Sequence, residues 1–218
     1  MLTHVLVTNS ISVTSGSVIF VGVQVSNSAT VSSITDSSLN TYTRVVSAIN
    51  GSLDSEIWKT TTTVASSGAL TLTITTTGSP GLANILAEVV EIQSTCTITV
   101  DTTGTNAGTG GSATVTLTTA SGGELVLVAA VGTNADGFNS LIATTPDSFV
   151  IQANPTPAPA GQTIAGGILG YFTTSAGPNT VAAEWAEGGT TWGQRLVWPS
   201  QQLEQTVYFS VLISTAYL

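Results

Sequence analysis

The sequence predicts an all-β fold, a β-sandwich of the jelly-roll or immunoglobulin-like type. Apolar and polar residues alternate with a period of two, as in half-buried strands. Threonine and serine make up roughly 30% of the chain, far above average usage, and the β-branched threonine suits a pleated surface. Turn signals rich in glycine recur between the apolar runs, and no stretch has a convincing helical period.

The period-two pattern predicts strands at residues 5–7, 18–25, 69–76, 85–92, 95–100, 113–118, 124–131, 163–172 and 206–214. The clearest is Leu70-Thr71-Leu72-Thr73-Ile74, apolar on one face and threonine on the other. Residues 82–92 have a helix-like spacing, but their ending, Glu88-Val89-Val90-Glu91-Ile92, favours a buried strand. Asn50-Gly51 predicts a hairpin turn, and Asn50-Gly51-Ser52 is also a formal glycosylation sequon.

The strand spacing predicts a single domain over residues 1–218. Ser15-Gly16-Ser17-Val18-Ile19-Phe20-Val21 is echoed by Gly122-Gly123-Glu124-Leu125-Val126-Leu127-Val128, which allows a pseudo-duplication into 1–94 and 95–218. Chance similarity in a chain of few residue types competes with it. The proline-alternating residues 154–160 predict an extended surface loop within the domain.

Charge excludes some partners. Only 7% of the residues are charged, the net charge is −9, and the basic residues are Arg44, Lys59 and Arg195. Nucleic acid is not an expected partner, because phosphate binding needs clustered cations. No apolar run reaches the length of a membrane span, and residues 1–9 lack the basic start of a signal peptide.

Few residues offer catalytic or metal chemistry. His4 and Cys96 are each the single residue of their type, so no Cys-based zinc site or disulfide framework is expected. We expect His4 to be an edge or partly buried residue and Cys96 to pack as a small apolar side chain. Asp36 and the Asp136-Gly137-Phe138-Asn139 segment are read as turn formers, not calcium loops. We therefore predict no cofactor and no metal.

Paired carboxylates flank one tryptophan. Glu184 and Glu187 surround Trp185, as in the acidic pairs of glycosidases. In a strand, their odd separation directs the two side chains to opposite faces. One cleft would then not receive both, so the pattern disfavours an enzyme.

An aromatic group follows, formed by Trp185, Trp192, Arg195 and Trp198. These residue types are common at binding hot spots, which makes them candidates for a sugar-binding or subunit-docking face. A cluster capping one end of the core is the favoured alternative.

Residues 29–45, Ala-Thr-Val-Ser-Ser-Ile-Thr-Asp-Ser-Ser-Leu-Asn-Thr-Tyr-Thr-Arg-Val, resemble a motif of Ser/Thr/Ala-rich β-sandwich domains from phage virion and prokaryotic surface proteins. Ala120-Ser121-Gly122-Gly123-Glu124-Leu125-Val126 resembles the start of a later strand in that family. The resemblance implies a structural or adhesive role without catalytic residues. Leu39 stands where the family usually has glycine, which leaves the turn there open.

We therefore expect a non-enzymatic structural protein of a virus particle: a capsid decoration, minor capsid or tail-appendage subunit. Its expected partners are its own copies or other virion proteins, and its expected location is the virion. The alternative is an extracellular or cell-surface filament subunit, adhesin or carbohydrate-binding module with a glycan as ligand. In that alternative, the apolar segments 5–7 and 207–213 are candidate donor strands for exchange between subunits.

Overall fold

The computed structural model describes residues 3–78, 85–93, 97–107, 112–120, 124–132, 138–143, 149–151, 165–172, 177–185 and 208–215. Over these residues the protein is all-β and contains no helix, which confirms the predicted fold class. The strands are β1 (Thr3–Val7), β2 (Ile11–Val13), β3 (Val18–Val25), β4 (Thr30–Asp36), β5 (Tyr42–Asn50), β6 (Leu53–Thr60), β7 (Gly68–Leu70), β8 (Leu72–Thr77), β9 (Ile85–Ile92), β10 (Thr99–Ala107), β11 (Ser112–Thr119), β12 (Leu125–Gly132), β13 (Phe138–Ala143), β14 (Phe149–Ile151), β15 (Ala165–Phe172), β16 (Gly177–Trp185) and β17 (Tyr208–Thr215).

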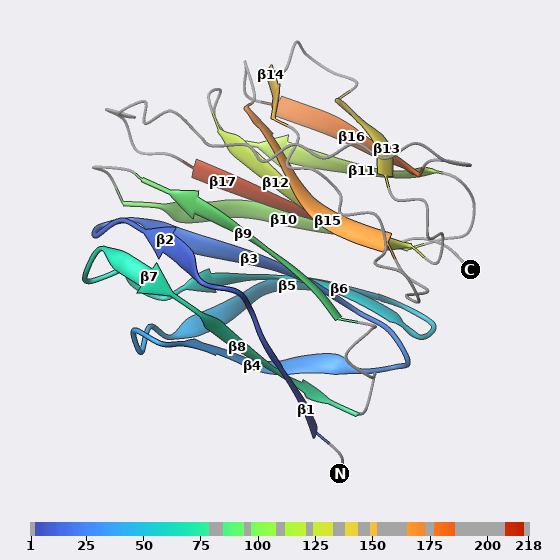
Figure 1. Ribbon diagram of the computed structural model, residues 1–218. Coiled ribbons are helices and arrows are strands. Elements are labelled where there is room, and N and C mark those ends of the chain that lie inside the picture. The colour runs from blue at the N-terminus through green and yellow to red at the C-terminus, as the bar shows by residue number, and fades with distance from the viewer. Residues whose placement is uncertain are drawn as a thin grey trace.

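The strands form layered sheets (Figure 1). The outer sheet has the order β1-β8-β4, and the central sheet has the order β5-β6-β3-β9. A five-stranded sheet, β10-β17-β12-β15-β14, packs on the other face of the central sheet, and β11-β16-β13 lies beyond it. A short β2-β7 pair extends the β1–β8 ribbon.

The central sheet is covered on both faces. Its strand β3 shows this directly, because all eight of its residues are buried. Ile19 and Val21 belong to the core shared with the outer sheet, together with Leu72 and Ile74. Phe20 points the other way, into a second core that includes Leu125 and Leu127 of β12. Alternate residues of one strand therefore join two cores, which is why β3 is almost entirely apolar, with Gln24 as its one polar side chain.

The predicted segments 18–25 and 85–92 match β3 and β9, and the segments near 5–7, 113–118, 124–131, 163–172 and 206–214 match strands within two residues at each end. The segment 69–76 is instead divided into β7 and β8. At the break, the Thr71 carbonyl accepts from the Ser37 amide, and the Thr71 amide donates to Ser37 Oγ. Turn contacts there replace strand pairing.

The predicted segment 95–100 starts too early in the chain, because β10 begins at Thr99 and runs to Ala107. The hairpin prediction at Asn50-Gly51 is confirmed: Asn50 pairs with Leu53, and Gly51 has a φ of 58°. A positive φ is the conformation for which glycine is suited. The proline-rich segment 154–160, Cys96 and Asp136 lie outside the described residues.

β17 adds a feature that a purely antiparallel sandwich lacks. It lies between β10 and β12 and runs parallel to both. The segment at 5–7 likewise pairs with β8 of its own chain. Both candidate donor strands are therefore integrated into sheets of the same chain. In the described part of the protein, no helix is long and apolar enough to cross a membrane.

Candidate functional site

The exposed surface of the outer sheet is a regular, uncharged array. In the register of β1, β8 and β4, Thr75 lies between Val5 and Ser33, while Thr73 lies between Val7 and Thr35. Alternate positions of β8 are buried, so its threonines share the opposite face. We call this surface the threonine face; its side chains are Val5, Val7, Thr30, Ser32, Ser33, Thr35, Thr73, Thr75 and Thr77.

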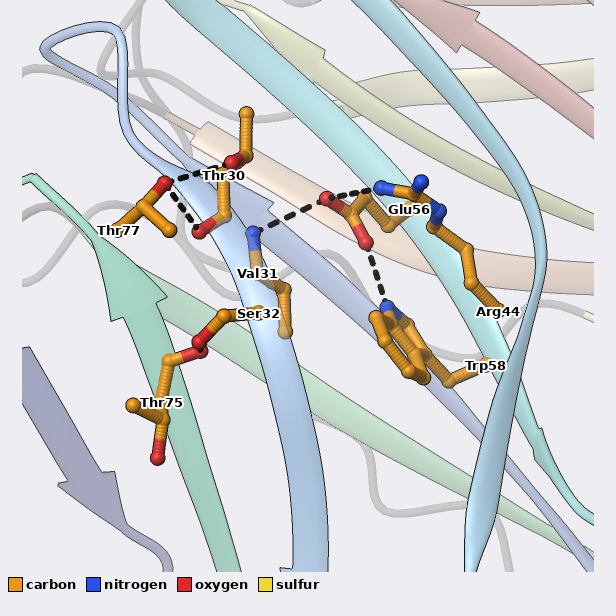
Figure 2. Close-up of polar contacts among 8 residues, drawn as sticks. All are labelled: Thr30, Val31, Ser32, Arg44, Glu56, Trp58, Thr75 and Thr77. Atoms are coloured by element: carbon orange, nitrogen blue, oxygen red, sulfur yellow. Dashed lines mark hydrogen bonds and ion pairs between the residues drawn. The ribbon is translucent and has the colours of Figure 1, made fainter.

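Hydrogen bonds order part of this face (Figure 2). Thr30 Oγ1 and Thr77 Oγ1 lie 2.7 Å apart, and Ser32 Oγ donates to the Thr75 carbonyl at 2.9 Å. A bulge between Val31 and Ser33 exposes Ser32 and Ser33 together. The hydroxyl groups are thus partly held by neighbouring strands, while methyl groups and the two valines supply apolar area.

The outer sheet is also nearly free of charge. Residues 1–35 and 60–87 contain no Asp, Glu, Lys or Arg, and these ranges include β1, β8 and all of β4 except Asp36. Asp36 is only 6% exposed. The net charge of −9 is therefore carried elsewhere in the chain.

Glu56 of the central sheet forms a hydrogen bond with the backbone of β4 in the outer sheet (Figure 2). Its side chain is fully buried. Oε1 accepts from the Val31 amide at 3.1 Å, and Oε2 accepts from Trp58 Nε1 at 2.6 Å. Glu56 and Trp58 are two residues apart on β6 and share a face, so one carboxylate joins two sheets.

Arg44 supplies the balancing charge from β5. Its Nη1 lies 3.6 Å from Glu56 Oε1, and its guanidinium carbon lies 6.0 Å from the centre of the Trp58 ring. Arg44 pairs with Trp58 in the sheet, and the β5 register shifts between Arg44 and Val46. The Arg44 side chain is 48% exposed, so this ion pair connects the surface to the interior.

Asp54 adds a second buried carboxyl, two residues before Glu56 on the same strand face and 1% exposed. Burial first, then the neighbouring carboxylate of Glu56, raise the pKa of Asp54 to about 8. Arg44 and the Ser55 backbone act in the lowering direction. Asp54 therefore holds a proton at neutral pH.

Asp36 organises the turn between β4 and β5, as expected for a turn former. Its Oδ1 accepts from the Ser38 and Asn40 amides at 2.9 and 3.0 Å. Its Oδ2 accepts from Asn40 Nδ2 at 2.8 Å and from the Tyr42 hydroxyl at 2.7 Å. Burial, followed by this last hydrogen bond, raises the pKa of Tyr42 above its ordinary value. Leu39, at the turn, has a φ of 61° and is 88% exposed.

The other residues singled out in the sequence divide into two groups. His4 is partly buried on the edge strand β1, as expected, and its Nε2 is buried without a hydrogen-bond partner. Trp185 ends β16, where its backbone pairs with Phe138, and Glu184 precedes it on the same strand. Trp192, Arg195, Trp198 and Glu187 lie outside the described residues. Among the described residues, no group of three or more His, Cys, Asp or Glu side chains is arranged for a metal ion.

Sequence reasoning missed Asp54, Glu56 and Trp58 as a group, and β6 with them. The segment Leu-Asp-Ser-Glu-Ile-Trp-Lys-Thr does not alternate between apolar and polar residues, and one of its faces carries two acids and a tryptophan. The available signal was the Asn50-Gly51 hairpin turn, which requires a strand after it as well as before it. Polar residues suggested a solvent-exposed face, whereas cross-sheet hydrogen bonds here make a buried one.

Comparison with protein-family models, curated proteins and solved structures finds no match to this chain.

Proposed function

We propose that this protein is a non-enzymatic structural subunit of a virus particle, as a capsid decoration, minor capsid or tail-appendage protein. It would associate with its own copies or dock on other virion proteins. The observation that carries this proposal is the threonine face, an ordered and charge-free sheet surface in a chain whose net charge is −9.

A surface of this kind favours protein contact for a physical reason. Burying a charged group costs free energy unless it is paired, whereas hydroxyl groups keep hydrogen bonds with neighbouring strands or the partner. Depletion of charged residues is also the compositional mark of the buried centre of protein interfaces. The threonine face can therefore be covered at little desolvation cost.

The buried carboxylates support a structural role as well. Glu56 and Asp36 accept hydrogen bonds from backbone amides that belong to the β4 strand and its following turn. Their polar groups stabilise the layer that carries the threonine face. With Glu56 fully buried and Asp54 1% exposed, this carboxyl pair is enclosed, in contrast to the open acid pair of a glycosidase.

Quantitative mass spectrometry of purified virions and of cell-surface fractions from the producing culture tests the proposal. We expect the chain in the particles, at a copy number comparable with other structural subunits. Absence from particles would overturn the virion assignment. Its recovery from cell-surface filaments would favour the alternative of an extracellular filament or adhesin.

A further inference from the structure

The two free edges of the outer sheet differ. At β4, the Val31 amide is occupied by Glu56, Thr35 forms an isolated bridge with Thr41, and the strand is bulged between Val31 and Ser33. Occupied backbone groups and bulges are devices that discourage another strand from adding to a sheet edge. The β4 edge is therefore blunted.

The β1 edge carries none of these devices. Its five residues, Thr-His-Val-Leu-Val, include no proline, glycine or charged side chain, and their pairing with β8 is regular. In the described part of the chain, β1 has β8 as its one neighbour in the sheet. Val5 is 47% exposed and Val7 is 61% exposed. A regular, uncharged edge with exposed valines is a template for strand addition.

We propose that β1 of one copy pairs antiparallel with β1 of a second copy, joining their outer sheets into one six-stranded sheet. This inference rests on the proposed structural function and names its partner and contact. Antiparallel pairing about a two-fold axis must keep outward residues opposite outward residues. Val5 on the axis satisfies this and brings all five residues of each β1 into pairing, with Val5 opposite Val5 and Val7 opposite Thr3.

Charge favours a second copy at this edge. Two molecules with a net charge of −9 repel unless they meet through neutral surfaces. β1 and β8 are uncharged, and the one acidic residue of the outer sheet, Asp36, is buried on β4. A lysine-rich or acidic strand from another protein would find no opposite charge on β1, whereas β1 itself offers β-branched cross-strand pairs.

Sedimentation velocity of the purified chain over a range of concentrations tests the contact. We expect a monomer–dimer equilibrium in the unmodified protein and dimerisation about tenfold or more weaker in Val5→Lys, because two lysines would then face each other across the axis. Leu39→Lys is the matched control, since it adds the same charge at an exposed residue away from β1. It should dimerise as the unmodified protein does, and circular dichroism should show that both variants remain folded.

A cross-linking variant tests the register. With Val5 on the axis, the two copies place this residue opposite itself, within the Cα spacing that a disulfide spans. In a Cys96→Ser background, Val5→Cys should form an intermolecular disulfide under mild oxidation, and Leu39→Cys should not. Equal cross-linking of the two variants would overturn the proposed register.

The outcomes separate this inference from the proposed function. Association that survives Val5→Lys overturns the β1 contact and leaves the structural function supported through another surface. A monomer at every concentration overturns the β1 contact, while recovery of the chain in virions would still support the function. Absence from virions together with a β1-dependent dimer overturns the function alone.

Discussion

Glu56 is the residue on which the attachment of β4 most depends. It is fully buried, and its carboxylate accepts from the Val31 amide and the Trp58 indole while facing Arg44. A buried donor that loses its acceptor retains its desolvation penalty, at about 1–3 kcal/mol for each group. The polar contacts that join β4 to the central sheet are therefore concentrated in one side chain.

Replacing Glu56 tests this dependence. Glu56→Ala leaves the Val31 amide and the Trp58 indole without an acceptor. It should lower the free energy of unfolding by about 3–5 kcal/mol, a range typical of broken buried ion pairs. Glu56→Gln retains one oxygen acceptor and should cost less. Urea denaturation followed by tryptophan fluorescence measures the difference. Equal losses for the two variants would contradict the hydrogen-bonding role.

Asp54 gives the protein a specific pH dependence. Its pKa is raised to about 8 in the folded state, against 3.8 as the ordinary value. Between these values the folded state binds a proton that the unfolded state has released. Stability contributed by the protonated form is therefore greatest at low pH, falls as pH rises from about 4 to 8, and levels off above the folded pKa.

Asp54→Asn should remove this component, because the amide does not titrate. Relative to the unmodified protein, the variant should gain stability as pH rises, by at most about 1.4 kcal/mol per pH unit for one proton. Urea midpoints at pH 5, 7 and 9, converted to free energies, measure the difference. A constant difference between the two proteins across this range would contradict the raised pKa.

At the scale of elements, side-chain hydrogen bonds stabilise the β4–β5 connection, although one of its residues has an unfavourable backbone conformation. Asp36 accepts four hydrogen bonds there, from the Ser38 and Asn40 amides, Asn40 Nδ2 and the Tyr42 hydroxyl. Leu39 takes a φ of 61° with its side chain 88% exposed. The left-handed backbone conformation costs a residue other than glycine about 1–2 kcal/mol. Because the Leu39 side chain is largely exposed, its packing offsets little of this cost.

Leu39→Gly should therefore stabilise the protein, by about 0.5–1 kcal/mol after the entropy that glycine loses on folding. Leu39→Ala is the control, since it removes the same exposed side chain but keeps the Cβ atom. It should give no comparable gain. Thermal unfolding by differential scanning calorimetry compares the three proteins, and stabilisation by alanine equal to that by glycine would refute the backbone explanation.

For the whole molecule, β3 is the strand through which the layers are coupled. Val21 packs toward the outer sheet and Phe20 toward the five-stranded sheet. Both are fully buried. Neighbouring residues of one strand thus belong to two cores, and loss of either core removes a face of the same central sheet.

Phe20→Ala and Val21→Ala should accordingly shift one shared unfolding transition. The larger truncation should cost about 3–5 kcal/mol and the smaller one less. Calorimetry of the two variants tests this, with the unmodified chain as reference. Two separate transitions, each moved by a single variant, would show that the cores unfold independently.

The sequence alone determined the all-β class, the main apolar strands and the turn role of Asp36, because period-two alternation and turn chemistry are local properties of the chain. Strands such as β3 and β9 were predictable to the residue, since continuous or alternating apolar runs must be buried. The β6 strand was not, because a buried Glu56 is acceptable in a core only where Val31 and Arg44 of other strands join Trp58 of β6 around its carboxylate.

The tertiary structure decided the rest. It placed the central sheet between two others, put β17 parallel between β10 and β12, and brought β1, β8 and β4 together in one outer sheet whose single charged residue is Asp36. It also distinguished a blunted β4 edge from an open β1 edge, a difference that depends on which backbone groups a remote side chain reaches. These features depend on which distant segments pair with each other, and local residue patterns do not reveal that pairing.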